Sequence, residues 1–374
     1  MTIRDNIQKL MNTRTGGEKN GRTTGRVRRY LNRLCEHQVK AMLRLVERDS
    51  RPNMTALNEK LRDIDMLSLN IKANGYRLAR ILAEALPPAA HNGPQDIVPG
   101  SKLCTQEDIE SDWSRYWSGE LQIPVVFHRK LWEYTYLLQA LHASGNIAPG
   151  RVGLGFGCGL EPIASYLASR DVKATITDLP PEHQRVSGWA SSNEYVETLE
   201  KAHVATLVDR EKFIRQVSHR HVDMNAIPDD LSGFDFCWSV CALEHLGSIQ
   251  KGLDFIEASL RTLRPGGTAV HTMEFNINPD GPTVDNWMTV LFQRKHIEGL
   301  VQKLESQGHK VAPLDFNAGN RPMDQFIDIP PWNGDLLGPV IGELGMRGNA
   351  NHLKLSVDGF AATCFAITIT RGNG

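Results

Sequence analysis

Residues 152–162, VGLGFGCGLEP, limit the folds open to this chain more than any other segment. They follow a short apolar run that predicts a strand and lead into a helical stretch near 160–169. Gly155, Gly157 and Gly159 let the backbone turn tightly and approach a ligand closely. A glycine turn between a strand and a helix predicts an open α/β sheet with a ligand at its carboxyl edge.

The periodicity after residue 150 supports such a sheet. Apolar runs predict strands at 151–154, 174–177, 234–240, 268–272 and 361–370, and weaker runs suggest two more at 217–222 and 310–313. Helical stretches near 160–169, 182–201, 248–263 and 285–306 separate the earlier strands. This alternation predicts a Rossmann-like parallel sheet with helices on both faces. The last strand has no long crossover helix before it, so we expect it to insert antiparallel.

The sequence before the sheet predicts a helical region. Residues 1–25 are rich in Gly, Thr and charge and are expected to form a flexible tail. Residues 26–90 carry two amphipathic stretches broken at Arg51-Pro52, which predict a helical hairpin and a candidate oligomerisation region. Residues 91–127 read as a connecting segment, and the main domain then spans 128–374. The connecting segment holds Trp113, Tyr116 and Trp117; packing against the next domain is favoured over a substrate-stacking wall.

The charge balance and the cysteines of the chain limit which binding partners and which cellular compartment are expected. The chain has 42 Lys+Arg against 43 Asp+Glu, a balance that argues against sequence-specific nucleic-acid binding. Basic residues gather between Arg22 and Arg48, where a solvated helix face is favoured over peripheral membrane or protein contact. Six cysteines without a C-x-x-C pair fit a reducing cytoplasm. No run approaches the ~20 apolar residues of a spanning helix.

The spacing of the glycines separates two ligand classes. Dinucleotide-binding turns follow G-x-G-x-x-G, but Leu160 or Pro162 stands at the third glycine position here. The spacing is instead G-x-G-x-G, which disfavours a dehydrogenase.

Four further segments stand in order along the sheet. Asp178 ends the second strand in ITDLP, 19 residues after Gly159. Asp223-Met224-Asn225 follows the third strand, FDFCWSVCALEHL spans the fourth, and LRPGGT leads into the fifth. With GFGCG, residues 150–374 resemble a class I S-adenosylmethionine-dependent methyltransferase. The resemblance implies S-adenosyl-L-methionine as cofactor.

In this resemblance, Asp178 binds the ribose hydroxyls of the cofactor. Gly153 stands where the family has an acidic residue, and Glu161 is the candidate replacement that holds the cofactor's amino group. The implied cofactor-binding residues are Gly155, Phe156, Gly157, Gly159, Glu161, Asp178, Leu179, Asp223, Met224 and Ser239.

The segments HRKLWE, ALEHLGS, VHTMEFN and NHLKL further resemble bacterial methyltransferases linked with surface-polysaccharide modification. This implies O-methylation of a sugar hydroxyl on a glycan, sugar nucleotide or lipid-linked saccharide. Two alternatives stay open: a nitrogen or another small metabolite as acceptor, and a cofactor-binding scaffold in a glycan-assembly complex.

A sugar hydroxyl needs a general base, because it is a poor nucleophile at neutral pH. We predict that His245 or His271 takes its proton and that Glu244 or Glu274 orients the base; the alternative for His245 is mere packing beside the cofactor. The same four side chains could ligate a divalent metal, but their spacing matches no metal motif, so a metal site is kept only as a minor alternative. The long stretch 316–359 is a candidate substrate lid. The predicted substrate-binding residues are His128, Arg129, Trp332 and His352.

Overall fold

The computed structural model describes residues 53–90, 93–180, 198–330 and 351–373. The chain divides into two compact units, Met1–Ile71 and Lys72–Gly374. The first predicted helix, the tail and most of the predicted helix at 182–201 lie outside the described residues.

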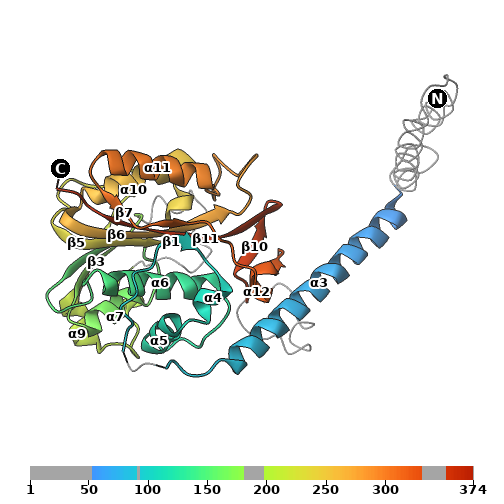
Figure 1. Cartoon of the computed structure of the whole chain (residues 1–374), viewed down its shortest axis with the longest axis horizontal. Coiled ribbons are helices and arrows are strands. Elements are labelled where there is room, and N and C mark those ends of the chain that lie inside the picture. The colour runs from blue at the N-terminus through green and yellow to red at the C-terminus, as the bar shows by residue number, and fades with distance from the viewer. Residues whose placement is uncertain (1–52, 91–92, 181–197, 331–350, 374) are drawn as a thin grey trace, which may run out of the picture. The chain divides into compact units, whose positions relative to one another are not determined.

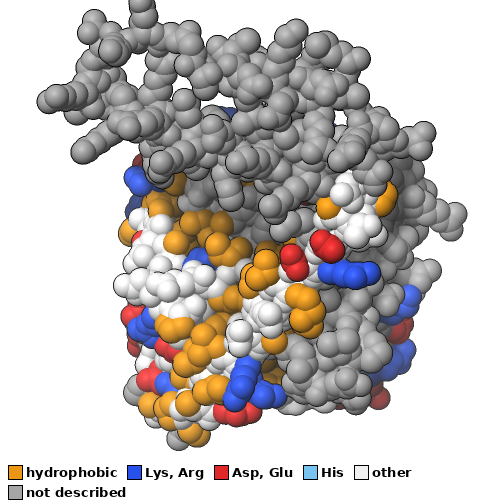
Figure 2. Space-filling view, turned by 90° about the vertical axis from the view of Figure 1, so that its right-hand side faces the viewer, with side chains coloured by type: hydrophobic (Ala, Val, Ile, Leu, Met, Phe, Trp, Pro, Cys, Tyr) orange, Lys and Arg blue, Asp and Glu red, His pale blue; other side chains and the backbone are white. Residues whose placement is uncertain are grey.

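The boundary between the units falls within helix α3, Met54–Ala85. This is the second predicted helix; it begins after Asn53, whose side chain accepts the Ala56 N–H at 3.0 Å, and ends before Pro87-Pro88. Its residues in the first unit expose large apolar side chains, among them Leu61, Ile64 and Leu67. On the face that Figure 2 presents, hydrophobic side chains lie between charged ones.

Five parallel strands form the centre of the second unit, in the order β4-β3-β2-β5-β6 (Figure 1). Their bounds are β2 Val152–Phe156, β3 Lys173–Asp178, β4 Val217–His221, β5 Phe234–Val240 and β6 Leu263–Asn276. The chain runs outward from β2 to β4 and then returns to β5 on the other side of β2, so the strand order reverses beside β2. Ligands bind at such a switch point, outside the carboxyl ends of the strands. The predicted Rossmann-like sheet is confirmed.

The last strand, β11 (Phe360–Thr370), pairs antiparallel with β6, as predicted. It also pairs with β1 (Ser101–Leu103), β7 (Lys310–Val311) and β10 (Lys354–Val357). β8 (Leu314–Asp315) continues the sheet beyond β1, and β9 (Ile327–Asp328) pairs with β10. The segment expected to be only a connection therefore contributes β1, together with the short helices α4 (Gln106–Ile109) and α5 (Asp112–Glu120).

Helices cover both faces of the sheet (Figure 1). On one face lie α6 (Arg129–Ala143), α7 (Ile163–Ser169) and α9 (Arg210–Gln216), and on the other lie α10 (Ile249–Leu260) and α11 (Arg294–Ser306). Each face has its own apolar core. Trp113 and Trp117 are buried in the first of these cores, which confirms the packing interpretation of the aromatic group.

The predicted helix at 285–306 is too long by about two turns. It begins only at Arg294, after the capping residue Gln293. The residues before it form a loop in which the Asp285 carboxylate accepts the Ile249 N–H at 2.8 Å, and so cap α10 instead of extending α11. Among the described helices, none is long and apolar enough to cross a lipid bilayer.

Candidate active site

The glycine turn after β2 is tied to the carboxyl end of β3. The Cys158 N–H donates to the Thr177 carbonyl at 3.1 Å, and the Thr177 hydroxyl donates to the Gly155 carbonyl at 2.8 Å. The Gly159 N–H points at the Asp178 carboxylate, with its nitrogen 3.2 Å from Oδ2. These contacts fix the turn beside a buried carboxylate at the switch point of the sheet.

Side chains are excluded from this turn on steric grounds. Gly157 has φ +60°, and a Cβ there would lie 2.7 Å from Cβ of Ala242. A Cβ on Gly155 would collide with Cys158 and Trp238. A Cβ on Gly153 would collide with the ring of Phe236, so the position where the resembling family has an acid has no room for any side chain here.

Glu161 provides a carboxylate on the same turn. Its Oε2 is buried and has no hydrogen-bond partner among the described residues. Burial raises the pKa of Glu161 well above its usual value, nearby Asp178 and Glu133 add to the rise, and Lys130 opposes it. Buried polar atoms without a partner are rare, and they mark places where polar groups of a ligand fit.

The other predicted cofactor residues differ in the contacts that they make. Met224 reaches the turn, because its sulfur would lie 3.5 Å from a Cβ on Gly157. Asp223 accepts the Asn225 N–H at 2.8 Å, and Leu179 follows Asp178 directly. The ring of Phe156 is buried and packs edge-on against Phe255 of α10, so this residue can contact a cofactor only through its backbone.

His271 does not reach the site, although the sequence analysis made it a candidate base. It is fully buried between β6 and α10, where its Nδ1 lies 2.8 Å from the Ser239 hydroxyl and its Nε2 lies 3.0 Å from the Ser259 hydroxyl. Burial lowers its pKa to about 3. Both ring nitrogens are engaged within the core, so this histidine and Ser239 are structural.

His245 ends the short helix η3 (Leu243–His245), directly after β5. Its Nδ1 lies 2.9 Å from the Met288 carbonyl and 3.2 Å from the Thr289 hydroxyl. A carbonyl oxygen only accepts, so Nδ1 carries the proton in the neutral ring and the lone pair is on Nε2. This is the tautomer that a general base using Nε2 requires.

A buried cluster that sequence reasoning missed lies where α6 meets the ends of β5, β6 and β11. Glu133 is its centre: it accepts the Thr272 hydroxyl at 2.6 Å and the Cys364 thiol at 3.3 Å, and it lies 3.5 Å from Lys130. Burial acts to raise the pKa of Glu133, but Lys130 and Arg129 outweigh it and the pKa is lowered. The sulfur of Cys364 is 3.5 Å from that of Cys241.

The predicted substrate-binding pair on α6 has mixed roles. Arg129 forms an ion pair with Glu274 and lies in this cluster, while its Nε is buried without a partner among the described residues. His128 caps α6, because its Nδ1 accepts the Lys130 N–H at 3.1 Å. Its ring is 4.8 Å from that of His352.

His352 belongs to a buried polar network. Its Nδ1 lies 2.8 Å from Asp328, whose carboxylate also accepts hydrogen bonds from Lys72 and Tyr76 at 2.7 Å each. Both Lys72 and Asp328 are fully buried, so each charge requires the other. His352 is therefore held in place by its network. Trp332, the remaining predicted substrate residue, and the middle of the predicted lid lie outside the described residues.

The missed residues left weak signals in the sequence. Lys130 and Glu133 stand three residues apart in the sequence, a spacing that places charges side by side on a helix such as α6. Cys241 and Cys364 are 123 residues apart, and they come together because β5 and β11 pair with opposite edges of β6.

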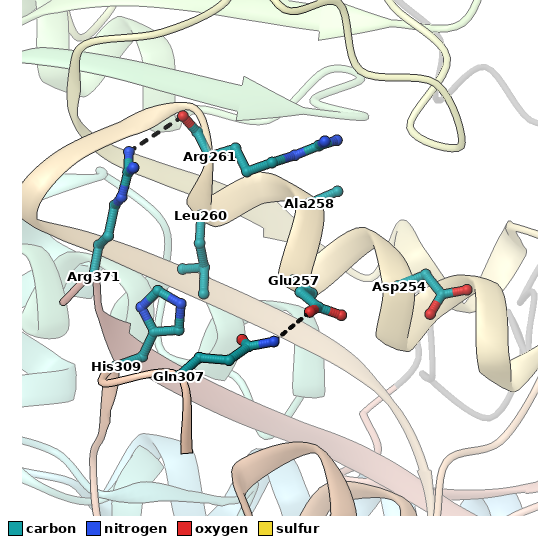
Figure 3. A pocket seen from close by; sticks show the side chains of 8 residues that line it. All are labelled: Asp254, Glu257, Ala258, Leu260, Arg261, Gln307, His309 and Arg371. Atoms are coloured by element: carbon teal, nitrogen blue, oxygen red, sulfur yellow. Dashed lines mark hydrogen bonds between the residues drawn. The ribbon is translucent and has the colours of Figure 1, made fainter. Parts of the chain in front are cut away.

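A separate pocket of about 460 Å³ opens at the opposite, amino edge of β6 (Figure 3). Arg371 donates to the Arg261 carbonyl at 3.3 Å, and Glu257 accepts from Gln307 at 2.7 Å. Its polar groups are largely engaged with one another, and it lies away from the switch point. We assign it no role in the site.

No protein-family model matches the chain, and no curated protein sequence matches it. Several solved structures align with part of the chain. A protein from Galdieria sulphuraria described as a proposed sarcosine dimethylglycine methyltransferase is 15% identical, with a TM-score of 0.39 over 64% of this chain and 84% of that one. Magnesium protoporphyrin IX methyltransferase from Synechocystis PCC 6803 is 10% identical, with a TM-score of 0.36 over 63% and 76%. Phosphoethanolamine N-methyltransferase 2 from Haemonchus contortus is 16% identical, with a TM-score of 0.35 over 63% of this chain and 52% of that one. Because these identities and TM-scores are low, the fold is assigned from the strand order of the chain itself.

Proposed function

We propose that this chain is an S-adenosylmethionine-dependent methyltransferase. The observation that carries the proposal is the position of the Asp178 carboxylate, at the end of β3 and against the Gly159 N–H of a side-chain-free turn. A carboxylate can accept hydrogen bonds from both hydroxyls of a ribose, and the turn lets an adenosyl group approach the backbone.

The remaining polar groups of the turn fit the rest of such a cofactor. Glu161 has a buried oxygen without a partner among the described residues, and it is available to accept from an ammonium group. Since Phe236 leaves no room for an acid at Gly153, the role of holding that group passes to Glu161. When bound, S-adenosylmethionine supplies an electrophilic methyl group on a sulfonium.

The chain itself must orient the acceptor, exclude water and take a proton. Orientation alone can contribute ~7–11 kcal/mol in favourable cases. His245 is the base in this proposal, because its Nδ1–H is fixed on Met288 and its Nε2 is in the accepting form. Glu244 and Glu274 lie at the same ends of β5 and β6, where both carboxylates are buried.

For the acceptor we propose a sugar hydroxyl, on the strength of the resemblance to polysaccharide-associated methyltransferases. A base such as His245 can also serve an amine acceptor, so the acceptor assay must include both.

The test is methyl incorporation from S-adenosylmethionine into saccharide acceptors, sugar nucleotides and amines, followed by mass spectrometry. A gain of one methyl on a sugar oxygen supports the proposal. Methylation of amines alone contradicts the acceptor, and cofactor binding without turnover on any acceptor would favour the scaffold alternative.

A further inference from the structure

Three side chains that could each ligate a metal ion lie close together at the carboxyl ends of β5 and β6. The proposed methyl transfer does not require the three of them to be together. Cys241 directly follows β5, Glu244 lies in η3 and Glu274 lies near the end of β6. One ligand atom of each, the Cys241 sulfur and a carboxylate oxygen of each glutamate, all lie within 4.8 Å of one another.

The two carboxylates are the unexplained feature. Glu244 is 0% exposed, and neither of its oxygens has a hydrogen-bond partner among the described residues. Glu274 is 5% exposed; its Oε1 pairs with Arg129, while its Oε2 also has no partner among the described residues. Taking a carboxylate out of water costs several kcal/mol, so buried carboxylates are normally paired or coordinate a metal.

The backbone at Cys241 is held in place by the end of β6. Its φ of +48° lies in the left-handed region, and its N–H is held by the carbonyl and the hydroxyl of Thr272, at 3.2 and 3.1 Å. The Cys241 sulfur lies 3.5 Å from that of Cys364 and within 4.8 Å of a carboxylate oxygen of each glutamate.

We infer that Cys241, Glu244 and Glu274 form a Zn²⁺ site. Sulfur together with carboxylate oxygen suits zinc, whereas magnesium and calcium take oxygen ligands alone. Three protein ligands are the pattern of zinc sites that keep a fourth position for water or substrate. An acceptor hydroxyl in that position would become more acidic, which ties the site to methyl transfer, but metal binding itself does not depend on that function.

The surroundings suit such an ion. Cys241 is partly exposed, which gives an ion a route to the site, and Arg129 fixes the Glu274 carboxylate from its other oxygen. Zinc binding releases one proton, from the Cys241 thiol to solvent, and forms the Zn–S bond without any redox step. Cys364, at 3.5 Å from the Cys241 sulfur, can then turn its S–H toward the new thiolate.

The experiment uses the full chain, stripped with a chelator and then titrated with Zn²⁺ alone or Co²⁺ alone. Metal content is measured by mass spectrometry, Zn²⁺ affinity by calorimetry, and the thiolate-to-cobalt charge-transfer absorption by spectroscopy. The variants are Cys241→Ser, Glu244→Gln and Glu274→Gln. Cys237→Ser, a buried cysteine of β5, and Glu257→Gln, a glutamate of α10, are the controls.

We expect one Zn²⁺ per wild-type chain and per control chain. Cys241→Ser should lose the charge-transfer absorption, and each Gln variant should lose more affinity than the roughly 10- to 100-fold that removal of an outer-shell partner costs. Metal-free Glu244→Gln should melt no lower than metal-free wild type, because it removes an unpaired buried charge, and added Zn²⁺ should not raise its melting temperature. A wild-type chain that binds no zinc, or Cys241→Ser and Glu244→Gln chains that bind it as wild type does, overturns the inference. Affinity for S-adenosylhomocysteine is measured separately, so failure of the zinc site and failure of the methyltransferase proposal are distinguishable.

Discussion

The Asp178 carboxylate accepts the Gly159 N–H with an oxygen-to-nitrogen distance of 3.2 Å, which joins the end of β3 to the turn after β2. The contact holds the carboxylate at the switch point of the sheet. It also means that the turn must keep its shape if the carboxylate is to serve a ligand.

Gly157→Ala should therefore reduce affinity for S-adenosylhomocysteine and stability together. The left-handed φ costs about 1–2 kcal/mol with any Cβ, and this Cβ would also press on Ala242. Gly145→Ala is the matched control, because Gly145 has φ +70° but no atom within 4 Å of the added Cβ. Chemical unfolding and calorimetry of both variants measure the difference. Equal losses of stability in the two, with ligand affinity intact, would show that the turn tolerates a side chain.

Glu161→Gln should move stability and affinity in opposite directions. Burial raises the pKa of Glu161, which means that the charged carboxylate destabilises the folded, ligand-free chain. The neutral amide of the variant should therefore raise the melting temperature of that chain. A lost hydrogen bond to a charged amine is worth about 1.5–3 kcal/mol, or roughly 10- to 100-fold in affinity for S-adenosylmethionine. Thermal melting and calorimetry test both signs. Unchanged affinity would remove Glu161 from the cofactor site.

His245→Ala should lower turnover by about 10²- to 10⁴-fold, the usual contribution of a general base, with cofactor affinity unchanged. The His271→Gln variant separates the two predicted bases, because His271 is engaged with Ser239 and Ser259 in the core and its replacement should mainly affect stability. Single-turnover kinetics with saturating cofactor make the comparison. Full turnover in His245→Ala would leave the base unassigned.

His271 should make the fold acid-sensitive. Its pKa falls from 6.5 to about 3 on burial, so the unfolded chain binds the proton first. Stability then falls as the pH is lowered from about 6.5 toward about 3, by up to about 1.4 kcal/mol per pH unit from this residue. The free energy of unfolding of wild type and of His271→Gln is measured at several pH values. As the pH is lowered, the variant should become more stable relative to wild type. A constant difference would contradict the burial of a neutral ring.

The sequence predicted the sheet well because its signals are local. Alternating apolar runs placed all five central strands, and the absence of a crossover helix before residues 361–370 predicted the antiparallel strand β11. The glycine turn and Asp178 were also recognisable, since their spacing reflects the geometry of one strand–helix–strand unit, β2-α7-β3.

The side-chain directions could not be read in the same way. His271 and Glu274 lie three residues apart on β6, so their side chains point to opposite faces of the sheet, and only the packing of α10 and α6 decides which face belongs to the site. The cluster of Glu133, Cys241 and Cys364 depends on three elements distant in sequence. The helix expected from residue 285 starts later, because Asp285 caps a different helix.

Calorimetry of S-adenosylhomocysteine with wild type and Asp178→Ala is the most direct test of the proposed cofactor site. Asp230→Ala, an exposed aspartate paired with Arg220, controls for loss of a surface charge. The proposed geometry predicts that wild type and the control bind the ligand, and that Asp178→Ala loses roughly 100-fold in affinity, equivalent to about 3 kcal/mol. A wild-type chain that does not bind, or an Asp178→Ala chain that binds as tightly as wild type, would contradict it.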